Sequence, residues 1–215
     1  MAFITTRYNE LKLELAEKQV DLVAVSKTKP LEDLLEAYEE GQKDFGENYV
    51  QELLEKASAM PADTRWHFIG HLQTNKVKQI APVVYLVHGV DSEKLLSELN
   101  KQAAKLNKNI NCLLQVHIAE EETKFGFSME EVTAVNISSY PNLTICGLMG
   151  MASFTNDKEQ VQKEFRSLDK LYKEMQRKYP AFKTLSMGMS GDYKIAVAEG
   201  STMVRIGSML FGERK

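Results

Sequence analysis

Lys27 stands where an amine side chain could do chemistry. It follows a short apolar run, residues 22–25, and precedes a segment from Pro30 onward that has apolar residues at helical spacing. In a parallel α/β protein this places a lysine at the C-terminal end of a strand, where such proteins bind their ligands. A partly desolvated amine there can attack a carbonyl carbon and form a Schiff base. The alternative is an edge lysine whose stem packs and whose ammonium reaches water.

Arg205 is the second chemical candidate, because it interrupts an apolar strand at residues 203–206. Strand alternation places Met203, Arg205 and Gly207 on one face. If that face lines a barrel, the arginine needs a partner, and the inward face of the first strand offers no acid. We therefore expect a ligand with an acceptor atom. In the alternative, Arg205 faces a helix and pairs with a surface acid.

Glycine and hydroxyl residues surround the last two predicted strands, in segments 188–192 and 200–202 and at Gly207. Barrels often bind phosphate with the loops after strands 7 and 8, where glycine lets backbone N–H groups approach an anion. The alternatives are helix caps: an N-cap at Ser190 or Asp192, and a C-cap glycine before Ser201.

These three features together indicate one ligand class. A lysine suits an aldehyde, an inward arginine suits an acceptor atom, and the glycine loops suit a phosphate. Pyridoxal 5′-phosphate carries an aldehyde, a ring nitrogen and a phosphate on one small molecule.

Eight short apolar runs alternate with segments of helical periodicity, and these elements must position the candidate residues. The predicted strands are 22–25, 44–45, 66–69, 83–87, 112–118, 143–149, 184–187 and 203–206. This alternation predicts a (β/α)8 TIM barrel of class α/β, preceded by an extra N-terminal helix with Ile4, Tyr8, Leu11 and Leu15 on one face. An open doubly wound sheet is the alternative, and the lack of a Gly-x-Gly-x-x-Gly turn disfavours it. We also expect an N-cap at Asp91 and a capping box at Ser128 and Glu131.

The composition is that of an ordinary globular protein, with 215 residues, 43% hydrophobic and 27% charged. We expect a single domain over residues 1–215. A net charge of -3 disfavours nucleic acid and anionic membranes as partners. No apolar run could span a bilayer and no signal peptide is recognisable, so we expect a cytoplasmic protein. Cys112 and Cys146 are expected as free thiols. The pair His67 and His71 lacks a third ligand nearby, so no metal site is expected.

Six motifs, in chain order, carry a family resemblance. They are Val25-Ser-Lys27-Thr-Lys-Pro30, Phe45-Gly-Glu-Asn48-Tyr-Val-Gln-Glu52, Trp66-His-Phe-Ile-Gly-His71-Leu-Gln-Thr-Asn-Lys76, Leu148-Met-Gly-Met151, Ser186-Met-Gly-Met-Ser190 and Gly200-Ser-Thr202-x-Val-Arg205-Ile-Gly207. The chain closely resembles the pyridoxal phosphate homeostasis proteins, single-domain relatives of the N-terminal barrel of alanine racemase. The resemblance runs from the first strand to the C-terminus.

The resemblance implies roles for individual residues. Lys27 would hold the cofactor as an internal aldimine, and Arg205 would lie at the pyridine nitrogen. Asn48 and His71 would lie near the cofactor. The phosphate would be bound around Ser190, Ser201, Thr202 and Gly207.

An arginine at the ring nitrogen opposes its protonation and makes the ring a weaker electron sink. Racemases with a similar barrel add a C-terminal β domain and take a second base, a tyrosine, from another subunit. Only residues 208–215 follow the last strand here. We therefore expect a pyridoxal 5′-phosphate carrier for intracellular homeostasis, with no catalytic residues and no robust turnover. Apo pyridoxal-phosphate enzymes are candidate recipients, and a monomer is expected.

Two alternatives remain open. One is a pyridoxal-phosphate enzyme of the amino-acid racemase type, against which the chain end and the missing second base argue. The other is a Schiff-base aldolase acting on a phosphosugar. It would use the same lysine and phosphate loops, but it gives Arg205 no role.

Overall fold

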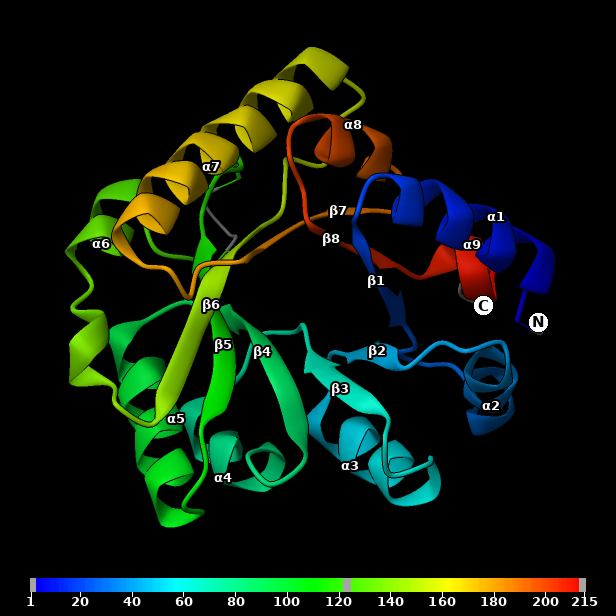
Figure 1. The fold of residues 1–215 in the computed structure, drawn as a ribbon, viewed down its shortest axis with the longest axis horizontal. Coiled ribbons are helices and arrows are strands. Elements are labelled where there is room, and N and C mark those ends of the chain that lie inside the picture. The colour runs from blue at the N-terminus through cyan, green and yellow to red at the C-terminus, as the bar shows by residue number, and fades with distance from the viewer. Residues whose placement is uncertain (1–2, 122–124, 213–215) are drawn as a thin grey trace.

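The computed structural model describes residues 3–121 and 125–212. Within these ranges eight parallel strands close into a barrel in chain order (Figure 1). The strands are β1 (Asp21–Val25), β2 (Asp44–Glu47), β3 (Arg65–Phe68), β4 (Val84–Val90), β5 (Ile110–Val116), β6 (Leu143–Gly150), β7 (Thr184–Met189) and β8 (Met203–Ile206). The predicted (β/α)8 barrel is confirmed, and the open sheet is excluded because β8 pairs with β1.

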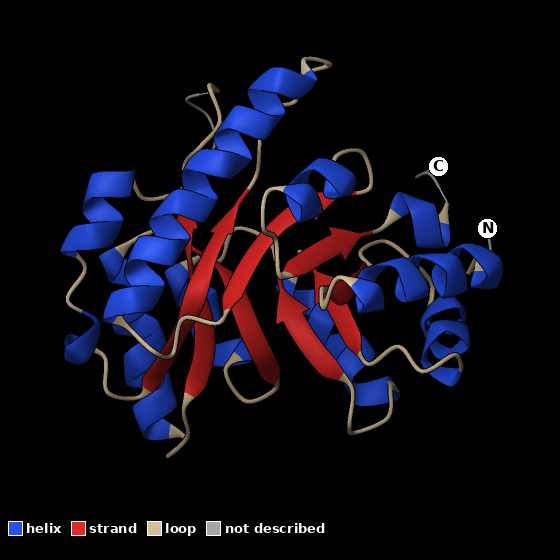
Figure 2. Ribbon diagram, turned by 45° about the horizontal axis from the view of Figure 1, so that its top comes forward, coloured by secondary structure: helices blue, strands red, loops and turns tan. Residues whose placement is uncertain are grey.

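Helices cover the outside of the barrel (Figure 2). They are α1 (Thr5–Glu17), α2 (Leu31–Glu39), α3 (Val50–Ala59), α4 (Val77–Ile80), α5 (Glu93–Lys105), α6 (Met129–Ala134), α7 (Lys158–Lys178), α8 (Tyr193–Ala198) and α9 (Ser208–Phe211), with 3-10 turns η1 (Thr74–Lys76) and η2 (Ile137–Ser139). The predicted extra helix is α1, which buries Tyr8, Leu11 and Leu15 but leaves Ile4 exposed. The Ile4 N–H donates to the Leu210 carbonyl at 2.8 Å, which fastens α1 beside α9.

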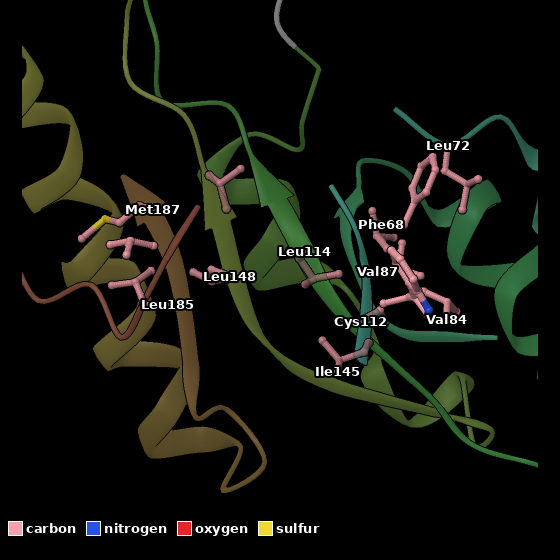
Figure 3. Close-up of a cluster of buried hydrophobic side chains, with 14 of the residues drawn as sticks. Phe68, Leu72, Val84, Val87, Cys112, Leu114, Ile145, Leu148, Leu185 and Met187 are labelled. Carbon is pink, nitrogen blue, oxygen red and sulfur yellow. The ribbon is translucent and has the colours of Figure 1, made fainter. Parts of the chain in front are cut away.

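The apolar core has two parts. The larger part fills the space between the strands and the helices, and Figure 3 shows a section of it that includes Phe68, Leu114 and Leu148. The smaller part lies inside the barrel and consists of Val23, Leu86, Leu113, Met149 and Met203. Strands buried on both faces, such as β5, are typical of parallel barrels. Each fully buried aliphatic side chain contributes about 1.5–3 kcal/mol.

Several strands are longer than their apolar runs predict, and in β2 and β4 the extension includes a buried polar residue. β2 continues through Gly46 and Glu47, which resemble a loop in the sequence. A Cβ at Gly46 would lie 3.0 Å from Val23 Cγ1, so the glycine leaves room for packing inside the barrel. β4 continues to Val90 and thereby includes His88. In both strands tertiary contacts bury polar residues that a hydrophobic pattern treats as the end of a strand.

One predicted helix cap is confirmed and one is wrong. Ser128 and Glu131 form the reciprocal capping box at the start of α6. The cap of α5 is Ser92 rather than Asp91, because the Ser92 hydroxyl accepts from the Leu95 N–H. Both cysteines are free thiols, as expected. In the described residues no three His, Cys, Asp or Glu side chains are grouped to hold a metal ion, and no described helix is long and apolar enough to cross a membrane.

Candidate functional site

A cavity of about 460 Å³ opens at the C-terminal ends of the strands. Its lining comes from loops that follow different strands: Lys27 after β1, Asn48 after β2, Met151 after β6, Ser190 after β7 and Gly207 after β8. Parallel strands place all these loops at one end of the barrel, which is why residues far apart in the sequence meet there.

Lys27 lies in a tight turn that leaves β1 and is half-buried at the cavity wall. The Lys29 N–H closes the turn by donating to the Ser26 carbonyl at 3.0 Å. Thr28 has a φ of 63°, in the left-handed region that a β-branched residue rarely adopts. Its N–H donates to Glu52 Oε1 at 2.6 Å, so a carboxylate on α3 holds the strained turn in place.

A buried ionic network lies beneath this turn and was not predicted from the sequence. Lys56 Nζ donates to Glu47 Oε1 at 2.8 Å, to Glu52 Oε1 at 2.6 Å and to the Ser26 carbonyl at 2.7 Å. The Ser26 hydroxyl donates to the same Glu47 oxygen at 2.6 Å. Burial raises the pKa of Glu47, and the charge of Lys56 opposes that rise. The network fixes the backbone on both sides of Lys27.

Lys29 is the second lysine at the cavity, and its ammonium is engaged elsewhere. Its Nζ donates to the carbonyls of Phe211, at 2.7 Å, and Gly212, at 3.1 Å. This contact ties the Lys27 turn to the segment that follows β8. The geometry therefore gives Lys29 a structural role.

Arg205 points into the barrel, as strand alternation predicts, and is 4% exposed at the floor of the cavity. Its Nη1 donates to the Ser186 carbonyl at 2.8 Å and to Ser186 Oγ at 2.6 Å, and its Nη2 donates to the Gly150 carbonyl at 3.1 Å. The sequence-based expectation that the chain leaves Arg205 without a partner is therefore wrong, because β6 and β7 supply three acceptors. A guanidinium has five N–H groups, so two remain beyond these described bonds. Burial lowers the pKa of Arg205 to about 10, which leaves it a cation at neutral pH.

Ser190 and Gly207 bring the loops after β7 and β8 together. The Gly207 N–H donates to Ser190 Oγ at 3.3 Å, and both residues line the cavity. A Cβ at Gly191 would meet nothing within 4 Å, so the space beside this backbone is open. An anion could approach the main chain closely here.

Ser201 and Thr202 lie at the opposite end of the barrel, and neither lines the cavity. The Ser201 hydroxyl lies 2.7 Å from the Met187 carbonyl, and Thr202 Oγ1 accepts from the Leu185 N–H at 2.7 Å. They precede β8, whereas Gly207 follows it, so the length of the strand separates them from the phosphate loops. The structure thus places the two hydroxyls as partners of the β7 backbone and not at the predicted phosphate site.

Asn48 and His71 differ in their relation to the cavity. Asn48 lines it, and its Oδ1 is buried with no hydrogen-bond partner among the described residues. His71 is not part of the lining: its ring stacks on Phe125, with centroids 4.0 Å apart, and its Nδ1 lies 2.9 Å from Asp91 Oδ2. The loop residue Lys124, which follows the fifth predicted strand, lies outside the described residues.

Known proteins are similar to this chain in both sequence and fold. The family model described as "Alanine racemase, N-terminal domain" matches residues 2–215. A pyridoxal phosphate homeostasis protein of Vibrio alginolyticus is 44% identical over 215 residues, which cover 97% of this chain and 92% of that protein. The structure of PipY from Synechococcus elongatus without PLP has a TM-score of 0.92 at 35% identity and covers 97% of this chain and 100% of PipY. The structure of PipY with PLP bound has a TM-score of 0.87 at 34% identity and covers 97% of this chain and 99% of PipY. The chain therefore belongs to the family of pyridoxal phosphate homeostasis proteins, which share the barrel of the alanine racemase N-terminal domain.

Proposed function

We propose that this chain binds pyridoxal 5′-phosphate in the cavity above β8 and serves the homeostasis of that cofactor without robust turnover. The observation that carries the proposal is the meeting of Lys27, Arg205 and the loop pair Ser190 and Gly207 in one cavity of about 460 Å³. The cofactor supplies an electrophilic aldehyde, a pyridine ring and a phosphate. Its presence in the related PipY structure supports the choice of ligand.

The residues of the cavity fit the cofactor group by group. Lys27 supplies the amine for reversible attachment of the aldehyde, and the aldehyde oxygen leaves as water. One of the two remaining N–H groups of Arg205 can donate to the ring nitrogen. Ser190 and the open backbone beside it can receive the phosphate. The buried Asn48 Oδ1 is a polar atom that a bound ligand would satisfy.

The side chains of the cavity favour a carrier over a racemase. In the described lining, the ionisable side chains are Lys27, Lys29 and Arg205, and Lys29 is bound to two carbonyls. No described carboxylate, imidazole, phenol or thiol lines the cavity, so a second base on the opposite face of a substrate is missing from this set. Arg205 also disfavours a protonated ring nitrogen, which weakens the ring as an electron sink.

The phosphosugar aldolase is not favoured by any observation. It would use Lys27 and the phosphate loops in the same way. It gives Arg205 no specific role, whereas the ring nitrogen of pyridoxal 5′-phosphate is an acceptor for one of its two remaining donors.

A transfer assay tests the carrier function. Purified protein loaded with the cofactor is mixed with an apo-enzyme that requires it, in the presence and absence of a trap for free cofactor. We expect reactivation of the apo-enzyme and no racemisation of alanine at an enzyme-like rate. Such racemisation, abolished by Lys27→Ala, would instead establish the racemase function. A protein that takes up a phosphosugar but not the cofactor would establish the aldolase.

We further propose that residues 1–215 act as a single domain, as a monomer and in the cytoplasm. Sedimentation of the loaded and unloaded protein tests the monomer, and a stable dimer would contradict it. Crosslinking to apo-enzymes during transfer tests whether recipients contact the protein directly.

A further inference from the structure

A chain of polar side chains runs through the interior of the barrel to Arg205. Asp44 Oδ1 lies 2.9 Å from His67 Nε2, and His67 Nδ1 lies 2.9 Å from His88 Nε2. His88 Nδ1 lies 3.0 Å from Ser186 Oγ, which accepts from Arg205 Nη1 at 2.6 Å. His67, His88 and Ser186 are fully buried. We call these five residues, Asp44, His67, His88, Ser186 and Arg205, the interior relay.

The interior relay crosses the barrel. His88 lies on β4 and Ser186 on β7, and these strands are not neighbours in the sheet. Their hydrogen bond therefore spans the inside of the barrel and does not run along the wall. Barrel interiors are usually packed with branched apolar residues, and buried polar groups there are costly unless each one is satisfied. Packing of the barrel interior therefore does not account for these polar side chains, whereas a functional role would.

The groups at the two ends of the relay, the Asp44 carboxylate and the Arg205 guanidinium, determine which atom donates in each hydrogen bond. Burial alone would raise the pKa of Asp44, but hydrogen bonds from Arg65 and His67 hold it below its ordinary value, so the carboxylate is ionised and only accepts. His67 must then donate from Nε2, and if its ring carries no second hydrogen, Nδ1 accepts from His88 Nε2. His88 in turn accepts at Nδ1 from the Ser186 hydroxyl.

The opposite direction leaves one proton without an acceptor. A doubly protonated His67 would donate to His88, and His88 would then donate to Ser186. The Ser186 oxygen would receive His88 and Arg205 together, and its own hydroxyl proton would meet no described acceptor. Burial lowers the pKa of His88 well below its ordinary value, so this ring is neutral and carries one hydrogen in either arrangement.

We propose that Asp44, His67, His88 and Ser186 are positioning residues that hold Arg205 against the cofactor ring through hydrogen bonds all donated toward Asp44. The inference rests on the proposed function, since the ring is that of pyridoxal 5′-phosphate. The relay places an acceptor at Ser186 Oγ and an anion at its far end. Ser186 thereby engages both hydrogens of Nη1, through its carbonyl and its hydroxyl, and other N–H groups are left for the ring nitrogen.

The first test determines the histidine tautomers of the relay in the protein without cofactor. Histidine labelled with 15N in the unliganded protein reports which ring nitrogens carry hydrogen, and His71→Gln and His117→Gln assign the other two of the four histidines. We expect His67 and His88 to carry hydrogen on Nε2 alone from about pH 8 to about pH 9, a range in which an ordinary histidine carries no charge. A proton on Nδ1 of either ring in this range would overturn the relay.

The second test measures how loss of the Ser186 hydroxyl changes the binding and the absorption of the cofactor, with a Ser201 variant as control. Ser186→Ala removes one of the three acceptors of Arg205, whereas Ser201→Ala removes another buried hydroxyl, whose described hydrogen bonds go only to β7 and β8 carbonyls. We expect Ser186→Ala to weaken cofactor binding roughly tenfold, as loss of one hydrogen bond to a charged group implies, and to shift the visible absorption of the bound cofactor. Ser201→Ala should leave both unchanged.

Equal spectra and affinities for the two variants would reduce the relay to a structural feature and overturn the proposal. Failure of the unaltered protein to bind the cofactor would overturn the proposed function. If the protein binds the cofactor but His67 or His88 carries hydrogen on Nδ1, the proposal for the relay is overturned and the proposed function stands.

Discussion

Lys56 reaches beneath the Lys27 turn to Glu47, with 2.8 Å between Nζ and Oε1, and the two side chains are 8% and 0% exposed. The same ammonium holds the Ser26 carbonyl, one residue before Lys27. A buried ion pair is weak evidence for net stability, but loss of one partner leaves the other charge buried. The pair therefore acts mainly to fix where the Lys27 turn lies.

Glu47→Gln should lower the free energy of unfolding by about 3 kcal/mol, because it removes one of the two carboxylates that neutralise Lys56 in the interior. It should also slow the attachment of the cofactor to Lys27. Glu55→Gln is the control, since Glu55 lies on α3 next to Lys56 but is exposed. That change should cost less than about 0.5 kcal/mol. Denaturant unfolding measures both values, and equal losses would show that the network does not stabilise the turn.

The pH dependence of stability should contain a contribution from Asp44. Hydrogen bonds from Arg65 and His67, working against burial, lower its pKa in the folded state. The unfolded state then binds the proton more readily, so the stabilisation is complete above the ordinary carboxyl pKa and is lost as the pH falls through the lowered value.

Asp44→Asn should therefore destabilise the protein at neutral pH by about 1–2 kcal/mol and make the unfolding free energy less steep in this acid range. Thermal unfolding from about pH 6 down to about pH 3 measures both effects. Glu36→Gln, at an exposed position on α2, serves as a control and should preserve the slope. An unchanged slope in Asp44→Asn would contradict the assignment.

The phosphate should be bound by the loops after β7 and β8 and not by the segment before β8. Ser190→Ala should weaken binding of pyridoxal 5′-phosphate several-fold and leave binding of pyridoxal, which lacks the phosphate, nearly unchanged. One hydrogen bond to a charged group accounts for a change of this size. The double variant Ser201→Ala with Thr202→Ala should alter neither affinity. Calorimetric titration of both ligands decides, and a phosphate-specific loss in the double variant would return these hydroxyls to the site.

Much of the barrel and part of the site can be predicted from sequence, because both follow from local pattern. Strand alternation alone places Arg205 inside the barrel, and the end of an apolar run alone places Lys27 at the ligand-binding end. Ser201 and Thr202 show where this reasoning stops. They are close to Arg205 in the sequence, yet the direction of β8 carries them to the other end of the barrel.

The interior relay lay beyond prediction for a different reason. The apolar run that predicts β4 ends at Val87, so His88 falls outside it, and His67 draws attention only as a neighbour of His71. The contact between His88 and Ser186 joins residues 98 positions apart on opposite walls of the barrel. His67 and His88 are the only signal of the relay in the sequence, and the closed barrel is needed to show that their side chains meet each other and Ser186.

Attachment of the cofactor at Lys27 is the central claim, and reductive trapping tests it most directly. The 215-residue protein is incubated with pyridoxal 5′-phosphate, reduced with borohydride, digested and mapped by tandem mass spectrometry. We predict one adduct, on Lys27, that is absent in Lys27→Ala and retained in Lys29→Ala, because the Lys29 ammonium is held by the carbonyls of Phe211 and Gly212. An adduct on Lys29 or on surface lysines in place of Lys27, or no adduct at all, would contradict the account.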